Sequence, residues 1–356
     1  MKPFQFVYYA SLLPLTISTS SADILYVNND TAFPAEYRSF DDAFAAAVDG
    51  DTIMLAPSLT TYGDIVVIGK SIKVIGGGTS NKFATLQPKN AEGLDTIVDQ
   101  VFIGLGEQDM TPNQPVPDFS GANGTQISSV RTRMGVWIWS DDCVFSRCET
   151  ASTFSVSGDR NIITGCELAG IRVRSHLNPV LNSTGTQFLN CVIPGGSDVN
   201  NDTTASFSHC IIGFNLTTGT PSSSGTYSSL ASTTFRHCII AGSTNSFNSY
   251  RSEGTRLHNC LVVGTVNSAV IPPHSSENNN LITTDQDSVF DEGFVLKAGS
   301  PAIGAGEDGE DLGVFGGPTP FEWGGFPALP LIEQFDILSA NPATGLRFRV
   351  KAVARD

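Results

Sequence analysis

The chain has 356 residues, of which 40% are hydrophobic and only 15% are charged, and its net charge at pH 7 is −15. An acidic chain with so few cations lacks the basic surface that nucleic-acid binding requires, which excludes nucleic acid as a partner. Its 35 glycines favour a protein with many tight turns. The length alone allows two domains, but solenoids and large β folds of this size are often single units.

The first 22 residues have the features of a signal peptide. Lys2 is followed by an apolar stretch over residues 4–17 and by the small residues Ser20, Ser21 and Ala22. The apolar stretch is too short to cross a bilayer, and no other apolar run approaches 18 residues, so we expect no membrane span. The sequence therefore predicts a secreted or cell-surface protein.

Short apolar segments follow, and one of them has the pattern of a helix. Residues 24–28 read as a first strand, and Ser39 is placed to cap a helix over residues 40–48 with acidic residues in its first turn. We expect this helix to cover the open end of a β stack, because an uncovered end exposes core and unpaired strand edges. Further short strands are expected within residues 50–57, 64–68, 71–78 and 84–88.

The centre of the chain is a repeat. An apolar residue, two mostly polar residues, a cysteine and further apolar residues recur six times, with cysteines at positions 148, 166, 191, 210, 238 and 260. The intervals of 18, 25, 19, 28 and 22 residues are too short for a βαβ unit and suit one turn of a solenoid. The pattern predicts an all-β, right-handed parallel β-helix over residues 23–320.

Within each copy, the cysteine and the residue two positions later share one face of a strand. The second positions are Thr150, Leu168, Ile193, Ile212, Ile240 and Val262, so this face is expected to point inward. The apolar residue three positions before each cysteine breaks the alternation, which requires a bend or bulge between the two.

The chain has seven cysteines, a number that in a secreted protein can indicate disulfides. Strand neighbours on successive coils have parallel Cβ vectors about 4.8 Å apart, which suits packing better than S–S bonding. We therefore expect buried thiols that fill a narrow core. Cys143 lies five residues before Cys148 and could pair with it, and the sequence leaves its state open.

The residue directly after each of the last four cysteines is apolar, although it should face outward. These residues are Val192, Ile211, Ile239 and Leu261. A bare apolar row on a sheet needs a cover, which could be a loop, the C-terminal hairpin, a second copy or another protein. The alternative is a local bulge that turns these side chains inward.

After Pro318 the composition changes. Residues 331–339 and 346–354 read as two strands around a turn at Asn341 and Pro342. Residues 321–356 are therefore assigned to a C-terminal β-hairpin, either a cap or an attachment segment.

The N-terminal segments resemble those of a known family. Residues 43–48, 50–53, 62–65 and 70–78 follow the order of helix, GDTI, Y-G-x-I and K-S-I-x-V-I-G-G-G, which is similar to the opening of pectin-lyase-like right-handed β-helix proteins. Residues 300–318 resemble the closing coil of secreted bacterial β-helix proteins. This family includes lyases, hydrolases, epimerases and inert surface proteins, so the resemblance implies a fold and leaves the activity open.

Acidic residues and arginines gather in and near the first two copies of the repeat. The candidate catalytic residues are Asp141, Asp142, Glu149, Glu167, Arg172 and Arg174. The resemblance implies that carboxylates, or a Ca²⁺ ion that they hold, would bind the carboxylate group of a uronate substrate. An arginine would then remove the proton on the carbon next to that carboxylate. Hydrolases of this fold instead use paired carboxylates as acid and base. The other interpretation is a solvated polar face.

Two motifs resemble catalytic signatures of this family without being complete. Residues 141–143 and 170–174 are similar to elements of polygalacturonase-type hydrolases, whose other two signatures are absent from this sequence. Residues 136–139 are similar to a pectate lyase strand, without its Asp and His.

Trp137, Trp139 and His176 are candidate substrate-binding residues. The two tryptophans point the same way on a strand, and an exposed pair would form a platform for sugar rings; packing in the core is the alternative. His209 and His237 each precede a cysteine and could share a metal ion, but the sequence shows no third ligand.

Two functions remain in view. The first is a secreted protein that binds or processes an extracellular, acidic polysaccharide along its sheet, as a lyase or glycoside hydrolase if it is an enzyme, with no cofactor certain and Ca²⁺ left open. The second is a non-enzymatic surface, adhesion or spacer protein. Convergence of Asp141, Asp142, Glu149, Glu167 and Arg172 in one place would favour an enzyme.

Overall fold

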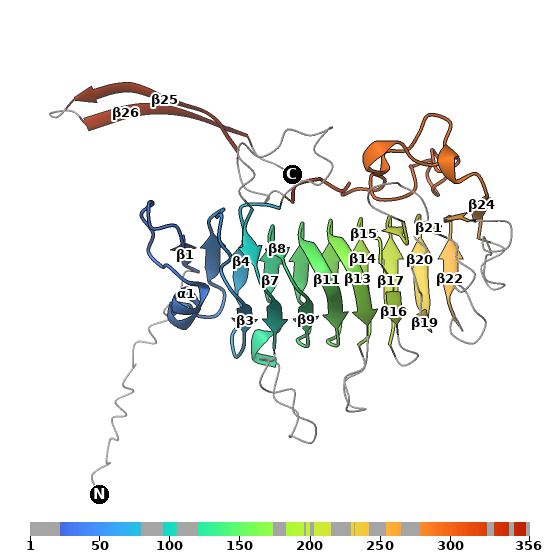
Figure 1. Ribbon diagram of the computed structural model, residues 1–356, viewed down its shortest axis with the longest axis horizontal. Helices are drawn as coiled ribbons and strands as arrows, with labels where there is room; N and C mark the ends of the chain where they lie inside the picture. Colours follow the sequence, from blue (N-terminus) through green and yellow to red (C-terminus); the bar gives the residue numbers. More distant parts are fainter. Residues whose placement is uncertain are drawn as a thin grey trace, which may run out of the picture.

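Two long parallel sheets form the body of the protein (Figure 1). The computed structural model describes residues 22–79, 95–104, 120–173, 183–195, 197–199, 203–214, 229–230, 232–241, 254–264, 278–325, 331–341 and 345–353. Strands of the same sheet are hydrogen-bonded to their counterparts one coil earlier and one coil later. This is the parallel β-helix that the repeat predicts.

The first sheet has ten strands. In spatial order they are β1 (Ile24–Val27), β2 (Thr52–Leu55), β4 (Lys73–Ile75), β7 (Gln126–Ser128), β10 (Val144–Ser146), β12 (Ile162–Thr164), β14 (Thr186–Leu189), β17 (Ala205–Ser208), β20 (Thr233–Arg236) and β22 (Arg256–His258).

The second sheet has fourteen strands. Its main path is β3 (Ile65–Val67), β6 (Val101–Ile103), β9 (Val136–Ile138), β11 (Glu149–Val156), β13 (Glu167–Val173), β15 (Val192–Ile193), β18 (Ile211–Ile212), β21 (Ile239–Ala241), β23 (Leu261–Val263) and β24 (Leu281–Thr283). Beside this path lie β5 (Ile97–Val98), β8 (Arg131–Thr132), β16 (Ser197–Val199) and β19 (Ser229–Leu230).

Helix α1 (Phe40–Ala46) lies beside β1 at the N-terminal end of the stack (Figure 1). The Ser39 hydroxyl accepts a hydrogen bond from the Asp42 amide at 3.1 Å, as the capping pattern predicts. Phe40 and Ala43 are buried among the core residues, and Lys70 donates to the carbonyl oxygen of Ala47 at 2.7 Å. The helix is thus fixed to the body, while its role in closing the end of the core stays a prediction.

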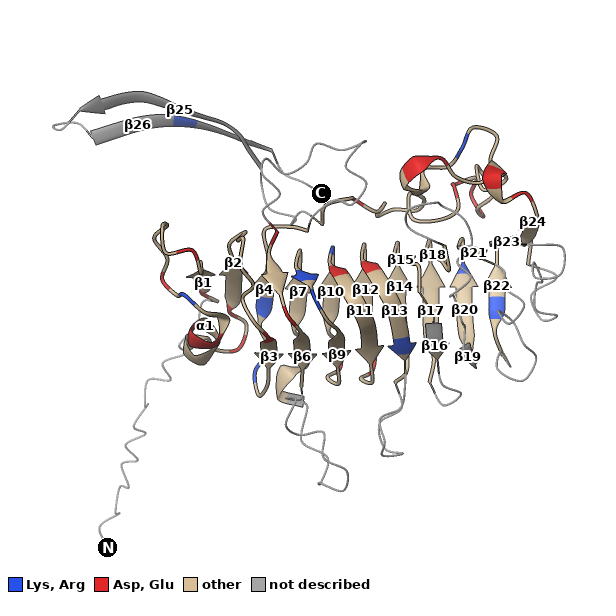
Figure 2. Cartoon of the chain, in the orientation of Figure 1, with Lys and Arg blue, Asp and Glu red and all other residues tan. Residues whose placement is uncertain are grey.

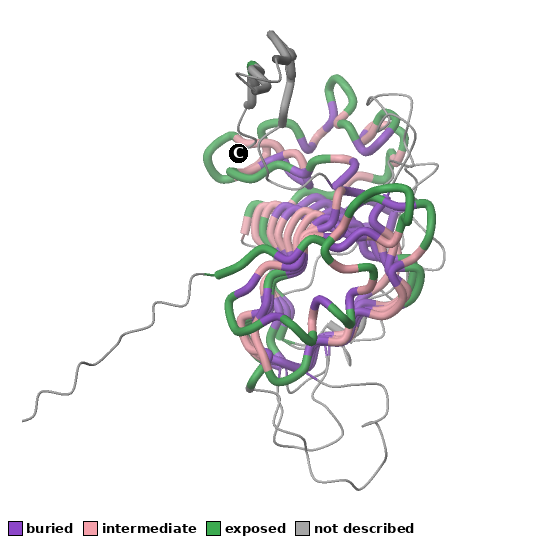
Figure 3. The backbone as a smooth tube through the Cα atoms, turned by 90° about the vertical axis from the view of Figure 1, so that its left-hand side faces the viewer, coloured by how far each residue is buried: buried purple, intermediate pink, exposed green. Residues whose placement is uncertain are grey.

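The core between the two sheets is built from rows of identical or similar residues on successive coils. Phe188, Phe207 and Phe235 occupy one row, with ring centroids 4.7 and 4.9 Å apart and nearly parallel planes. The end-on view shows the buried residues lining the inside of the coils (Figure 3). In-register pairing places the same position of each coil above the last, so one apolar position per repeat produces a continuous apolar row.

The predicted inward face is confirmed. Leu168, Ile193, Ile212, Ile240 and Val262 all belong to this core and are at most 1% exposed, and Thr150 is 2% exposed.

All seven cysteines are buried and free. The six repeat cysteines lie side by side within the core, as in-register packing predicts. Cys143 is not paired with Cys148, and its thiol lies 3.4 Å from the carbonyl oxygen of Asp141. Burial raises the pKa of Cys143 to about 12, and burial likewise raises the pKa of Cys238 and Cys260. The thiolate, which is the reactive form, is therefore scarce at these three cysteines.

A left-handed corner precedes every repeat cysteine. His209 has a φ of 52° and His237 a φ of 53°, and the equivalent residues are Arg147, Gly165, Asn190 and Asn259. A positive φ favours glycine and is tolerated best by Asn, Asp and His among other residues. This corner is the bend that the broken alternation of the repeat requires, and it turns the chain from the first sheet to the second.

After β24 the chain turns back along the stack (Figure 1). The segment 285–325, here called the return arm, contains the short 3-10 helices η4 (Gln286–Ser288) and η5 (Glu292–Phe294) and adds no strand to either sheet. The sequence analysis expected residues 300–318 to form a closing coil. They instead lie on the outer face of the second sheet, because their apolar side chains pack against its outward row.

The strands β25 (Leu331–Asn341) and β26 (Gly345–Val353) pair in antiparallel fashion and form a separate two-stranded sheet. The predicted C-terminal hairpin is therefore present, and its role as a cap or attachment segment stays a prediction. Helices long and apolar enough to cross a membrane do not occur in the described part of the chain.

Alkylation followed by mass measurement can test whether all the cysteines are free thiols. We expect the native protein to resist thiol reagents, because all seven thiols are buried and reagents cannot reach them. Alkylation in denaturant without reductant should add seven labels, one per cysteine, measured by intact mass. Fewer than seven labels would contradict the buried-thiol row and indicate disulfides.

The phenylalanine row can be tested by truncation. Phe207→Ala removes the central ring of the row and should lower the free energy of unfolding by about 3–5 kcal/mol. Leu59→Ala is the control, because Leu59 is 84% exposed and its loss should change stability by no more than about 0.5 kcal/mol. Denaturant unfolding measures both variants, and equal effects would refute the stacking account.

Candidate functional site

One outward row runs beside the left-handed corners and crosses most of the second sheet. Strand pairing places its members one above another, in the order Arg131, Glu149, Glu167, Val192, Ile211, Ile239, Leu261 and Leu281. The row is charged over the earlier coils and apolar over the later ones. The return arm lies over both parts.

Over the apolar part, the return arm supplies Val289, Phe294, Leu312 and Val314 to a second apolar cluster that is separate from the core. Within this cluster Val192, Ile239 and Leu261 are fully buried and Ile211 is 2% exposed. These four residues therefore do face outward, and a segment of the same chain covers them. They are not turned into the core by a bulge, and they are not available to a partner while the arm is in place.

Glu149 and Glu167, two candidate catalytic residues, lie on neighbouring strands in direct register. They are 2% and 8% exposed. Glu149 forms an ion pair with Arg131, whose Nε lies 3.4 Å from its Oε1, and Arg131 also contacts Asp95 at 3.2 Å. Buried carboxylates require such partners, and the sequence analysis identified neither Arg131 nor Asp95.

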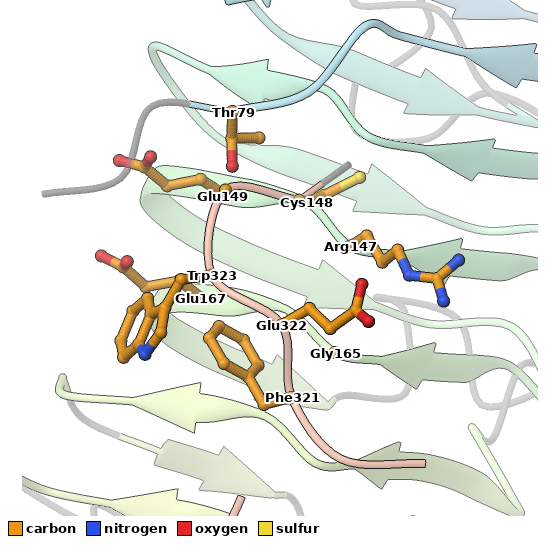
Figure 4. A pocket seen from close by; sticks show the side chains of 11 residues that line it. Thr79, Arg147, Cys148, Glu149, Gly165, Glu167, Phe321, Glu322 and Trp323 are labelled. Atoms are coloured by element: carbon orange, nitrogen blue, oxygen red, sulfur yellow. The ribbon is translucent and has the colours of Figure 1, made fainter. Parts of the chain in front are cut away.

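The end of the return arm covers this pair of glutamates (Figure 4). Phe321, Glu322 and Trp323 line one side of a small cavity, and Glu149 and Glu167 line the other. The Thr79 amide donates to the carbonyl oxygen of Gly324 at 2.8 Å, which holds the arm in place. The cavity volume is about 10 Å³, roughly the space of one water molecule, so a sugar ring does not reach the two carboxylates in this arrangement.

Asp141 and Asp142 lie elsewhere, at the turn before β10. Arg160 donates to both oxygens of Asp142, at 2.7 and 2.8 Å, and lies 3.6 Å from Asp141. These hydrogen bonds lower the pKa of Asp142. Asp141 Oδ1 also accepts a hydrogen bond from the amide of Asp159 at 2.8 Å, so both aspartates fix neighbouring turns.

Arg172, Trp137 and Trp139 lie at the other end of the strands of the second sheet. Here a second outward row runs through Phe102, Trp137, Ser155 and Arg172. Trp139 is 4% exposed and packs beside Phe102, so it does not offer a sugar platform. Trp137 is half-buried and Arg172 is exposed.

The position of Trp137 is well defined. Its ring stacks on Phe102 with centroids 5.0 Å apart and planes within 9°. It lies over Gly135, where an added Cβ would come within 2.7 Å of the indole. One face of the indole is thus covered by Phe102, and the other lies on the side of Ser155 and Arg172.

The structure separates the sequence-predicted site residues into three groups. Glu149 and Glu167 lie under the return arm, Asp141 and Asp142 at the turns, and Trp137 with Arg172 on the open face. Arg174 and His176 lie outside the described residues. The convergence of acidic residues and Arg172 that would favour an enzyme is absent among the residues that the structure describes.

A cluster of potential metal ligands lies where the return arm crosses β17 and β20. His209 Nε2 and His237 Nδ1 lie 3.4 and 2.9 Å from Glu310 Oε1. Burial, with His237 beside it, lowers the pKa of His209, although Glu310 opposes this shift. Sequence reasoning identified the histidine pair but missed Glu310, because no spacing rule links it to a strand some 70 residues earlier.

Comparisons with known proteins found only distant similarities to solved structures. No family profile matches the chain, and no curated protein matches it. Among solved structures it is similar to the pectate lyase Pel9A, with 13% identity, a TM-score of 0.43, and coverage of 83% of this chain and 96% of the other. It is also similar to a mutant pectin methylesterase in complex with a hexasaccharide, with 11% identity, a TM-score of 0.27, and coverage of 76% and 96%.

The fold of the chain is a parallel β-helix. The fold is given by the parallel pairing of the strands themselves. The two likenesses concern the fold and not the activity, as expected for a scaffold that carries many activities.

The attachment of the return arm can be weakened at Asn190. This buried residue donates from Nδ2 to the carbonyl oxygens of Val314 and Gly316, both at 2.9 Å. Asn190→Gly keeps the left-handed corner and removes both hydrogen bonds, which should lower the free energy of unfolding by about 1–3 kcal/mol.

Hydrogen exchange over residues 310–325 should also become faster in this variant. Asn279→Gly is the matched control, because Asn279 is an exposed residue with a φ of 52°. If both variants leave the exchange of the return arm unchanged, the arm is not held by Asn190.

Proposed function

We propose that the protein binds a uronate-containing extracellular polysaccharide without cleaving it, on the outward row of Phe102, Trp137, Ser155 and Arg172. The observation that carries the proposal is the in-register placement of an ordered indole and an exposed guanidinium on the same face.

The spacing of the row supports this proposal. Successive members of a parallel row lie about 4.8 Å apart, so Trp137 and Arg172 are about 10 Å apart with only the small Ser155 between them. A sugar ring stacked on the indole face that Phe102 leaves uncovered would bring its substituents toward Arg172. A guanidinium recognises a carboxylate with two parallel hydrogen bonds, which selects a uronate over a neutral sugar.

The placement of the carboxylates supports binding over cleavage. A glycosidase needs two carboxylates on either side of the bond that it breaks, and a lyase needs a base near the uronate. Glu149 and Glu167 are covered by the return arm, and Asp142 is engaged by Arg160. Neither pair lies in the row of Trp137 and Arg172.

The predicted location fits the same proposal, whereas the net charge limits how the ligand can bind. Strand β13 carries one cation, Arg172, and Figure 2 shows a blue segment on this strand. With a net charge of −15, the protein as a whole repels a polyanion, so binding depends on close contacts and strengthens when salt screens the repulsion. The predicted signal peptide would place the protein outside the cell with such a ligand.

Ca²⁺ is not required by this proposal. Calcium prefers six to eight oxygen ligands, and the one group of three or more His, Cys, Asp or Glu ligands found in the described part of the chain contains two histidines. Calcium could still bridge the acidic protein and an acidic polymer, so its addition belongs in the test.

The test is calorimetric titration with oligogalacturonate and with a neutral oligoglucan, each with and without Ca²⁺. Trp137→Ala and Arg172→Ala should each weaken oligogalacturonate binding at least about tenfold, which corresponds to 1.4 kcal/mol. Arg172→Lys should recover part of the affinity, since it keeps the charge but not the paired hydrogen bonds. Arg236→Ala is the matched control, an exposed arginine on the first sheet.

Two results would overturn the proposal. Absence of binding to oligogalacturonate, with and without Ca²⁺, would favour the spacer or adhesion role. Release of unsaturated products or new reducing ends would show a lyase or hydrolase instead. Thermal unfolding of each variant separates lost binding from lost fold.

A further inference from the structure

The cluster of His209, His237 and Glu310 has the donor set of a transition-metal site. Two imidazoles and one carboxylate are typical ligands of Zn²⁺ in proteins, with one further position left for water. No exposed acidic patch is involved: the side chain of His209 is 8% exposed, that of His237 13%, and that of Glu310 28%.

The distances fit such an ion. Ligand atoms about 2.0–2.1 Å from a tetrahedral metal lie about 3.3 Å from one another. The two nitrogen–oxygen distances, 3.4 and 2.9 Å, lie on either side of this value, and the three ligand atoms all lie within 4.8 Å of one another. A small rotation of one imidazole therefore completes the triangle around one ion.

His209 itself points to a missing partner. Its Nε2 is buried and makes no hydrogen bond of acceptable geometry, although it faces Glu310 Oε1. A buried polar atom without a hydrogen bond costs about 1–3 kcal/mol. A metal ion between His209 Nε2 and Glu310 Oε1 would give each atom a partner.

The ring nitrogens that face away from Glu310 have polar neighbours. Ser208 Oγ lies 3.1 Å from His209 Nδ1, and the side-chain amide of Asn259 lies 3.4 Å from His237 Nε2. Outer groups of this kind orient metal-binding histidines and fix which nitrogen carries the proton. With its amide oxygen turned toward His237, Asn259 would accept the Nε2 hydrogen and leave Nδ1 free for a metal.

The backbone brings these ligands together from distant parts of the chain. His209 and His237 occupy equivalent left-handed corners of neighbouring coils, and their rings lie 4.8 Å apart. The return arm crosses them closely: the Gly313 amide donates to the carbonyl oxygen of His237 at 2.9 Å. At Gly317, with a φ of 76°, an added Cβ would lie 2.8 Å from the His209 ring, so only glycine allows this approach.

We propose that His209, His237 and Glu310 bind a divalent transition-metal ion of the Zn²⁺ type, which clasps the return arm to two coils of the β-helix. The site joins residues more than 70 positions apart in the sequence. Its occupation would stabilise the cover over the apolar row, and it is independent of the polysaccharide proposal.

The test is titration of the metal-free protein with Zn²⁺ against a competing chelator dye, followed by thermal unfolding. We expect one Zn²⁺ per chain and a rise in Tm of about 5 °C at a hundredfold excess over Kd. Ca²⁺ should neither bind nor stabilise, because it prefers oxygen ligands.

Variants at the site should reduce affinity without unfolding the protein. His237→Ala and Glu310→Gln should each weaken Zn²⁺ binding at least about tenfold, and Glu310→Gln keeps the size of the side chain. His258→Ala is the matched control, because His258 is a half-buried histidine on β22 outside the cluster.

Co²⁺ distinguishes the ligands. Nitrogen and oxygen ligands give weak visible bands, whereas binding by the core cysteines would add strong sulfur-to-cobalt absorption in the near ultraviolet. Sulfur absorption, equal affinity of the Glu310→Gln variant and the native protein, or no Zn²⁺ binding at all would each overturn the proposal. In the last case the cluster is a contact between the two histidines and Glu310 that involves no metal ion.

Discussion

The structure depends on in-register stacking of parallel coils. Each residue of a coil has its counterpart about 4.8 Å away on the next coil, so every position in the repeat becomes a row along the molecule. A row inside the body must be apolar and of matching size, which the stacked phenylalanines and the buried thiols satisfy. A row on the outside can be polar where it faces solvent, or apolar where another segment of the chain covers it.

The left-handed corner beside each cysteine decides which rows face inward. It turns the chain from the first sheet to the second, so that both the residue three positions before the cysteine and the cysteine itself enter the core. Phe207 and Cys210, for example, are both buried in it. The corner residue is held outward, where Asn190, His209 and His237 all contact the return arm.

The return arm links the apolar cover, the buried glutamates and the metal-ligand cluster. It covers the apolar row with its own apolar residues, reaches the glutamate pair with Phe321 and Trp323, and brings Glu310 to the two histidines. Among the described residues, the row of Trp137 and Arg172 lies away from the arm, at the other end of the strands. The return arm crosses the strands of the second sheet at one end only. It therefore covers the row at that end and does not reach the row of Trp137 and Arg172.

The sequence by itself determined the β-helix fold. The recurring cysteine with its apolar neighbours specified the parallel β-helix, the inward residues and the free thiols, because these depend on contacts between equivalent positions of neighbouring repeats. It also marked Val192, Ile211, Ile239 and Leu261 as a row in need of a cover.

Only the tertiary structure decided what covers that row and which charged residues meet. Residues 300–318 carry no strand pattern that ties them to a particular face, and Glu310, Arg131 and Asp95 have no fixed spacing from the groups that they contact. Those contacts arise from the path of the return arm and from pairing between coils, which depend on the packing of the whole chain rather than on a local pattern. For the same reason the candidate site residues are near one another in the sequence and yet lie in separate places on the β-helix. These residues are Asp141, Asp142, Glu149, Glu167 and Arg172.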